Sequence, residues 1–274
     1  MKFLKETKNN IEYYTVPELT DAGFHNMFTT KLHGHSFPKR TEGGELNFGT
    51  NCNDTEEAIL KNYTDVLNLW NLSPDQGVKS KQTHSDITLT VDKSYGGEGI
   101  LREQRYPEAD GLITKEKDLA ILIFFADCVP ILIGDKKQKI CAAIHSGWKG
   151  TYKNIVGKAV EQLINNHNSK PEDLLCAIGP SIGPCHFEVS QDLYEEMTSL
   201  YGDDTGLITD NKYYLDLKKT VKKQLISHKV LEENIAVSTL CTVCEESLYS
   251  FRREGEASGR MAAFIALKND GNEN

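Results

Sequence analysis

One cysteine and two histidines are the residues of this chain best suited to hold a metal ion. Cys128 ends a short apolar run and is followed closely by Pro130, His145 ends another such run just before Gly147, and His84 precedes a third. Each lies where a buried strand is expected to break into a turn, and binding groups concentrate at such places. Two imidazoles and one thiolate supply three ligands and leave open the fourth position, which is typical of catalytic zinc sites. The pattern predicts an enzyme built around this trio.

Other readings of the same trio stay open. A free cysteine is often no more than a small core side chain, and a lone histidine on an apolar segment is usually structural. The same residues would also serve a cysteine hydrolase, with Cys128 as nucleophile and His145 as base. A non-catalytic metal-binding module is the least favoured alternative, because it would make the surrounding glycines and arginines incidental.

A cluster of guanidinium groups near the C-terminus is a candidate anion site. Arg252, Arg253 and Arg260 lie around a turn that contains Gly255 and Gly259. Arginine binds phosphate or carboxylate through paired hydrogen bonds, so we expect a phosphate pocket here, possible helpers being Lys31 and Lys149. The alternative is a solvated turn neutralised by the neighbouring glutamates.

Four further metal-ligating residues occur as two pairs. Cys241 and Cys244 form a C-x-x-C motif, which suggests half a zinc ribbon or a redox dithiol, although a structural or incidental placement is favoured. Cys185 and His186 follow a Gly- and Pro-rich loop that suits either a pocket wall or a tight turn. Adjacent residues of an extended segment point to opposite sides, so at most one of them is expected to join a shared metal site.

Composition narrows the class of protein. The chain has 274 residues and a formal net charge of −9, which argues against nucleic-acid binding because phosphate backbones require a basic surface. No apolar run approaches the roughly 20 residues of a membrane span, and residues 1–6 lack a signal-peptide core. Seven cysteines are scattered along the chain, which is typical of a reducing cytoplasm. We therefore expect a cytoplasmic protein with small-molecule partners and neither nucleic-acid nor membrane partners.

Apolar periodicity predicts one layered domain, of class α/β to α+β, around a mixed β-sheet. Helices and strands alternate only in the second half, and no repeat or linker divides the chain. Residues 33–35 (His-Gly-His) could bind copper or zinc if extended, but their polar neighbours favour a flexible loop. The expected helices cover residues 55–70, 149–164, 190–201 and 215–231, and the expected strands cover residues 87–91, 119–125, 129–133, 140–144, 174–178, 235–240 and 261–267.

Taken together, these segments resemble the YfiH-type family known as the multicopper polyphenol oxidase or laccase domain. The matching segments run in order over nearly the whole chain and comprise residues 46–62, 82–84, 126–130, 145–150, 178–189, 241–242, 249–253 and 259–260. The resemblance implies that residues 1–274 form a single laccase-type domain. It also implies that His84, Cys128 and His145 bind Zn²⁺.

The resemblance further implies a zinc-dependent purine nucleoside phosphorylase. Adenosine, inosine, guanosine and methylthioadenosine would be its substrates together with phosphate, and adenosine deamination would be a further activity. We expect this deamination to be slower than phosphorolysis. Asp127 is a candidate catalytic acid or a group that orients a ligand, and Asp127 or Glu188 would carry the proton in deamination. A copper polyphenol oxidase is less favoured, because the chain has only eight histidines and one His-x-His pair.

Two positions depart from the family pattern. Lys31 stands where the family usually has arginine, which keeps the charge but not the bidentate fork. The usual Gln-Val-His-Gly motif is here residues 82–85, Gln-Thr-His-Ser, which keeps the histidine but changes the turn after it.

Overall fold

The structure is a computed structural model and describes residues 1–36, 44–50 and 54–269. The Lys39 and Arg40 neighbours of the His-Gly-His segment, and Cys52, lie outside the described residues. Within the described part of the chain, no helix combines the length and apolarity needed to cross a bilayer.

The first six-stranded sheet brings together the two ends of the chain. Its order is β1-β2-β3-β16-β8-β5, and neighbours are antiparallel except for the parallel pair β5 and β8. The strands are β1 (Leu4–Lys8), β2 (Ile11–Thr15), β3 (Phe24–Thr29), β16 (Met261–Leu267), β8 (Ala120–Phe125) and β5 (Gly77–Lys79). The pairing of β3 with β16 places the N-terminal segment in the same sheet as the last strand.

The second six-stranded sheet is also mixed. Its order is β15-β11-β9-β10-β7-β6, with parallel pairs at both edges and antiparallel pairs between. The strands are β15 (Ile235–Val237), β11 (Leu174–Ile178), β9 (Val129–Asp135), β10 (Ile140–Ser146), β7 (Gly111–Thr114) and β6 (Thr88–Thr90). A small antiparallel sheet is formed by β12 (Glu188–Val189), β14 (Lys212–Leu215) and β13 (Gly206–Thr209).

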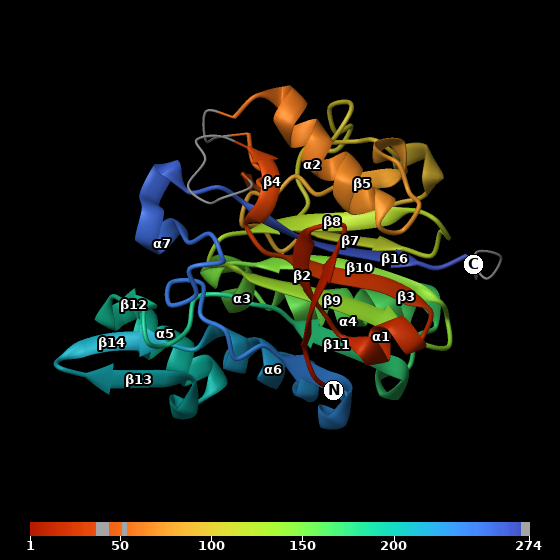
Figure 1. Cartoon of the computed structure of the whole chain (residues 1–274). Helices are drawn as coiled ribbons and strands as arrows, with labels where there is room; N and C mark the ends of the chain where they lie inside the picture. Colours follow the sequence, from red (N-terminus) through yellow and green to blue (C-terminus); the bar gives the residue numbers. More distant parts are fainter. Residues whose placement is uncertain (37–43, 51–53, 270–274) are drawn as a thin grey trace.

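The two large sheets stack face to face between helices, as Figure 1 shows. The outer face of the first sheet is covered by α2 (Glu56–Asn68), and that of the second by α4 (Ile155–His167) and α6 (Leu217–Ser227). Strands buried on both faces read as continuous apolar runs. In β8, for example, Ile121 faces the other sheet and Leu122 faces α2. The remaining described elements are α1 (Pro17–Asp21), β4 (Leu32–Ser36), α3 (Trp148–Tyr152), α5 (Gln191–Tyr201) and α7 (Phe251–Glu254).

The layered α/β class expected from the sequence is confirmed, but the strands form two stacked mixed sheets instead of one. The single helix expected over residues 149–164 is wrong in detail. Asn154 adopts a left-handed conformation (φ 59°) between α3 and α4, and its side chain accepts a hydrogen bond from the Gly157 N–H at 3.2 Å. The loop expected at residues 33–35 is also wrong, because they belong to β4, where His35 Nε2 lies 2.6 Å from Asp65 Oδ2.

Candidate metal centre

Two loops and the end of one strand carry the predicted trio at one end of the stacked sheets. His84 lies between β5 and β6, Cys128 lies in the turn that joins β8 to β9, and His145 is the penultimate residue of β10. The first two positions follow strands of the first sheet, and the third is on a strand of the second. The candidate centre therefore spans the junction between the sheets.

The structure brings the three side chains together. One potential ligand atom from each residue lies within 4.8 Å of those of the other two. Cys128 Sγ is 3.9 Å from His84 Nε2, and the two imidazole rings have centroids 5.2 Å apart. A thiolate and two imidazoles suit Zn²⁺, and these distances are compatible with one ion between them.

Asp110 is the group that holds this arrangement in place. Its Oδ1 accepts hydrogen bonds from His145 Nδ1–H at 2.8 Å and from the His84 backbone N–H at 3.1 Å. Its Oδ2 accepts from the Thr83 and Ser85 backbone N–H groups and from the Ser85 hydroxyl, at 3.0, 2.7 and 2.7 Å. Because Nδ1 of His145 is engaged in this way, its Nε2 is left to bind a metal, as in the carboxylate–histidine pairs of known metal sites.

Charges within the trio shift the pKa values of its members. Burial alone would raise the pKa of Cys128, but the charge of His145 and hydrogen bonds from both histidines lower it to about 6. Burial would lower the pKa of His145, but the Cys128 charge and the Asp110 hydrogen bond raise it to about 9. Burial would raise the pKa of Asp110, but its hydrogen bonds, chiefly from His145, lower it to about 2. The thiolate that a metal needs is therefore favoured at neutral pH.

Backbone conformation and close packing aim the side chains. His84 has a φ of +61° and Asp127 a φ of +92°, a region that non-glycine residues rarely adopt. Gly147 is required for a steric reason, because a Cβ at that position would lie 2.8 Å from His84 Cδ2 and 3.0 Å from Cys128 Sγ. Gln82 aligns the segment before His84 by donating to the Phe124 carbonyl at 2.9 Å and accepting from its N–H at 2.6 Å.

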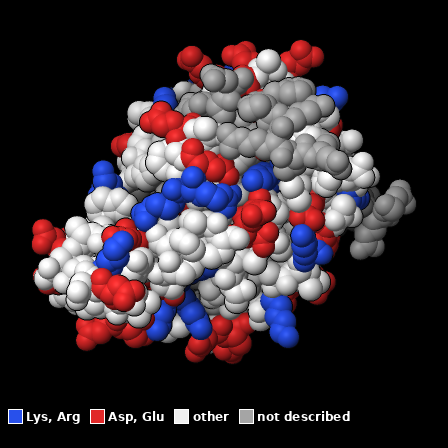
Figure 2. Space-filling view, turned by 60° about the vertical axis from the view of Figure 1, so that its left-hand side comes forward, with Lys and Arg blue, Asp and Glu red and all other residues white. Residues whose placement is uncertain are grey.

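A cavity of about 590 Å³ opens over the trio, which is a size typical of small-molecule sites. Its aromatic lining residues are Phe124, Phe125, Trp148, Phe187 and Phe251, and its basic lining residues are Lys79, Lys81, Arg252 and Arg260. Flat rings suit an aromatic ligand, and guanidinium and ammonium groups suit an anion. On the face that carries α7, Lys and Arg side chains form a short row among acidic side chains (Figure 2).

The residues expected to bind an anion are distributed unequally around this cavity. Arg252 and Arg260 line it. Arg253 is not among the lining residues, and its guanidinium donates to the carbonyls of Thr242 at 2.8 Å and Val243 at 2.9 Å. Arg253 is therefore placed to fix a loop.

The two lysines expected to help are also not among the lining residues. Lys31 Nζ is 3.8 Å from Glu254 Oε1, and Lys149 Nζ lies 5.6 Å from the ring centroid of Trp148. Sequence reasoning missed Lys79 and Lys81, which do line the cavity. Burial lowers the pKa of Lys79, and its Nζ lies 5.0 Å from the Phe124 ring centroid.

Asp127 reaches the cavity with both carboxylate oxygens engaged. Oδ1 accepts a hydrogen bond from the Thr242 hydroxyl at 2.5 Å, and Oδ2 accepts one from the backbone N–H of Arg252 at 2.6 Å. The other proposed proton carrier, Glu188, is paired with Lys212 at 2.9 Å and is exposed. This geometry favours Asp127 as a group that positions the turn bearing Cys128.

Comparison with known proteins identifies the family of this chain and several relatives. Residues 25–268 match the family described as multi-copper polyphenol oxidoreductase laccase. The chain is 34% identical over 262 residues to a purine nucleoside phosphorylase of Clostridium acetobutylicum, covering 94% of this chain and 98% of that protein. It is also 34% identical over 246 residues to the purine nucleoside phosphorylase YlmD of Bacillus subtilis, covering 88% and 87%.

Two of the solved structures with a similar fold come from Bacillus licheniformis and Geobacillus stearothermophilus. The crystal structure of the hypothetical protein YfiH of Bacillus licheniformis gives a TM-score of 0.85 at 31% identity, covering 95% of this chain and all of that one. The crystal structure of YlmD from Geobacillus stearothermophilus gives 0.86 at 30% identity, covering 97% and 99%.

Proposed function

Because this chain belongs to the multi-copper polyphenol oxidoreductase laccase family, we propose that it is a zinc-dependent purine nucleoside phosphorylase. Relatives named purine nucleoside phosphorylase match 94% and 88% of the chain, which supports a phosphorylase of this kind. We propose adenosine, inosine, guanosine and methylthioadenosine as substrates. The observation that carries the proposal is the convergence of a cysteine and two histidines beneath a cavity lined by aromatic rings and basic groups.

The metal would be held by His84, Cys128 and His145. A zinc ion with these three ligands retains one open position and supplies Lewis acidity to the group that enters it. Asp110 keeps His145 in the tautomer that leaves Nε2 available. The residues described here include a single His-x-His pair, in β4, so they favour a zinc ion at the trio over the several copper ions that the family description implies.

The cavity lining supports the two halves of the reaction. Phosphorolysis joins a phosphate oxygen to C1′ of the ribose while the C1′–N9 bond breaks, which gives the purine base and ribose 1-phosphate, and the leaving purine must gain a proton. Trp148 and Phe251 are partly exposed in the cavity and can stack on a purine. We propose that Arg252 and Arg260 bind the phosphate, because both line the cavity.

We further propose adenosine deamination as a slower activity of the same site, and that residues 1–274 act as one domain in the cytoplasm. The pairing of β3 with β16 supports the single domain. The free state of the described cysteines is compatible with a reducing compartment.

Incubation with inosine, with and without phosphate, tests the main proposal. We expect hypoxanthine and ribose 1-phosphate in equal amounts, only when phosphate is present, and loss of both in Cys128→Ala. The matched control is Cys141→Ala, which removes a buried thiol of β10 and should retain activity. Equal base release without phosphate would instead indicate a hydrolase.

The phosphate pocket is tested by comparing arginine variants. Arg260→Ala and Arg252→Ala should raise the KM for phosphate more than that for inosine, whereas Arg253→Lys should affect neither strongly. Unchanged phosphate dependence in both alanine variants would contradict the assignment. For deamination, conversion of adenosine to inosine should persist without phosphate and disappear in Cys128→Ala.

The alternative, a cysteine hydrolase, is favoured by one observation. The pKa values of Cys128 and His145 are those of a thiolate–imidazolium pair in the metal-free protein. An active protein free of bound metal, inactivated by alkylation of Cys128, would support this alternative.

A further inference from the structure

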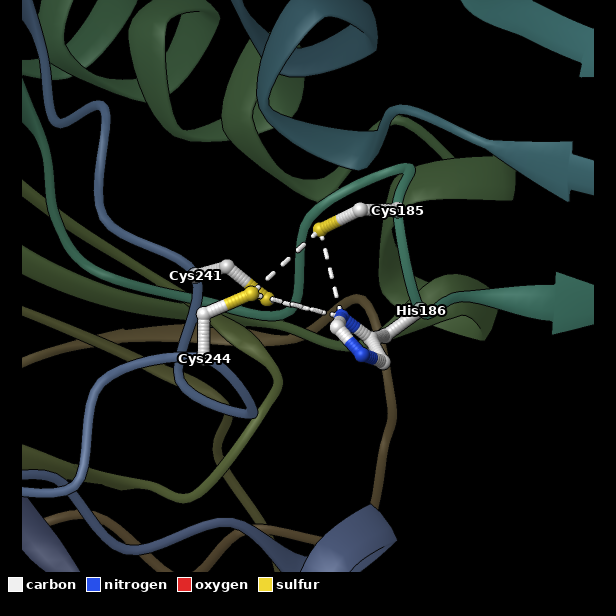
Figure 3. Close-up of side chains that lie close together, drawn as sticks. All are labelled: Cys185, His186, Cys241 and Cys244. Atoms are coloured by element: carbon white, nitrogen blue, oxygen red, sulfur yellow. Dashed lines mark hydrogen bonds between the residues drawn. The ribbon is translucent and has the colours of Figure 1, made fainter.

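A second group of metal-ligating side chains lies outside the trio. Cys185, His186, Cys241 and Cys244 converge at the surface, with one potential ligand atom from each within 4.8 Å of all the others. Figure 3 shows the three sulfur atoms and the imidazole directed toward a common point. The expectation that at most one of Cys185 and His186 would join a shared site is wrong, because residues 184–186 form a turn. In that turn Cys185 Sγ and His186 Nδ1 lie only 3.2 Å apart.

Apart from the 3.2 Å between Cys185 Sγ and His186 Nδ1, the separations are close to those of a tetrahedral zinc site. With Zn–S of about 2.3 Å and Zn–N of about 2.0–2.1 Å, tetrahedral angles place two sulfurs about 3.8 Å apart and a sulfur and a nitrogen about 3.5–3.6 Å apart. Cys185 Sγ is 3.8 Å from Cys244 Sγ, and His186 Nδ1 is 3.7 Å from Cys241 Sγ and 3.5 Å from Cys244 Sγ. A disulfide would need sulfurs about 2.05 Å apart.

The backbone around Cys241 is arranged to favour a thiolate. The Gly183 N–H donates to Cys241 Sγ at 3.2 Å, and the N–H groups of Val243 and Cys244 also donate to it. These two loops are joined by the Thr242 N–H, which donates to the Ser181 carbonyl at 3.1 Å. Several backbone donors on one sulfur stabilise its negative charge, which a metal ligand requires.

Neighbouring charge is complementary to such a site. Three thiolates, one neutral imidazole and Zn²⁺ leave a net charge of −1. Lys218 is 6% exposed, donates to the Leu240 carbonyl at 2.7 Å, and interacts electrostatically with Asp216 first and then with Cys241 and Cys185. Its positive charge next to the cluster partly balances the net negative charge of a zinc–thiolate site.

We propose that Cys185, His186, Cys241 and Cys244 bind a structural zinc ion that is separate from the catalytic site. All four positions are supplied by the protein, so the site is closed to substrate, unlike the three-ligand centre. The proposal does not depend on the proposed enzymatic function.

The position of this site indicates what the ion does. It fastens the turn at residues 184–186 to the loop at residues 241–244, and both loops support the cavity wall. Phe187 lines the cavity, Thr242 donates to Asp127, and Arg252 Nη1 donates to the His186 carbonyl at 2.7 Å. Zinc here would hold the wall that carries Arg252.

Metal content tests the proposal without reference to activity. We expect two zinc ions per chain in protein purified without chelators or affinity-tag metals, measured by elemental analysis and by native mass spectrometry. Cys244→Ser and Cys185→Ser should each lower the content to one ion, and Cys128→Ser should lower it to one ion by emptying the other site. The matched control is Cys176→Ala, which removes a buried thiol of β11 and should leave two ions.

Cobalt reconstitution identifies the ligands. The thiolate-to-cobalt absorption should fall more in Cys244→Ser than in Cys128→Ser, because the proposed site has three thiolates and the trio has one. Native mass spectrometry of the unaltered chain keeps the test decisive if a variant does not fold. The proposal is overturned if the unaltered chain binds one zinc that survives in Cys244→Ser, or if two of these cysteines are found as a disulfide.

Discussion

Asp110→Asn should be among the most damaging single changes outside the metal ligands themselves. The carboxylate is fully buried and accepts two hydrogen bonds on Oδ1 and three on Oδ2. Asparagine has nearly the same shape, but its amide nitrogen must replace one of the two oxygens. At least two donors then face another donor instead of an acceptor.

The expected loss can be worked out from these contacts. A hydrogen bond to a charged group contributes about 1.5–3 kcal/mol, so the loss of two should lower the free energy of unfolding by about 3–6 kcal/mol. The sign of the pH dependence follows from the pKa of Asp110, which is lowered to about 2. Stabilisation by the carboxylate should be complete above about pH 4, the ordinary aspartate value, and should be lost as the pH falls toward 2.

Urea denaturation with chelator present measures this loss without any contribution from bound metal. The matched control is Asp86→Asn. It removes a partly exposed carboxylate that directly follows residues 83–85, which Asp110 binds, and that pairs with Lys158 of α4; it should cost less than about 1 kcal/mol. Zinc affinity of the trio in Asp110→Asn should fall about 10–100-fold, because His145 loses its orienting partner. A loss below about 1 kcal/mol with unchanged zinc affinity would refute the argument.

Three further outcomes follow from the geometry of the centre. Gly147→Ala should reduce zinc affinity at the trio with little change in unfolding free energy measured in chelator, because the added methyl group meets His84 and Cys128; unchanged affinity in a metal titration would contradict this. In the metal-free protein, the rate of iodoacetamide alkylation at Cys128 should level off just above pH 6, where the thiol is ionised, and zinc should protect it; a rate that climbs steadily to pH 9 would show an ordinary thiol. Gln82→Ala should detach the segment bearing His84 from Phe124 and lower zinc affinity, whereas Gln82→Glu should lower it less because it keeps an acceptor for the Phe124 N–H. Equal zinc affinities in both variants would argue against a role of Gln82 in placing His84.

The parts of the fold that sequence predicts well are the strands buried on both faces. Residues 120–125 and 129–135 read as apolar runs because each side of the strand meets a core. The edge strand β1 gives no such signal, since all five of its residues are exposed. Asn154 interrupts the expected helix through a left-handed conformation that local composition does not reveal.

The residues of the candidate site also differ in how clearly the sequence reveals them. Residue type and sequence context single out the three residues of the trio, because each is a potential metal ligand beside an apolar run, and binding groups concentrate at strand ends and the loops that follow them. Asp110 gives no local signal. Its role depends on contacts with residues that are separated from it in the sequence by 25 to 35 positions. The convergence of Cys185, His186, Cys241 and Cys244 is not predicted for a related reason. Cys185 and Cys244 are 59 positions apart in the sequence and come together only because residues 184–186 form a turn.

The division of the trio between two sheets has a consequence for the order of events in folding. His84 and Cys128 follow strands of one sheet and His145 belongs to the other, so neither layer alone can hold the ion. Capture of zinc must therefore wait until the layers have docked, a late step that depends on contacts distant in sequence. In the presence of cobalt, stopped-flow refolding of Cys244→Ser, which removes a ligand of the second proposed site, should show thiolate–cobalt absorption from Cys128 only after most secondary structure has formed. The appearance of this absorption would then report the time at which the two sheets dock.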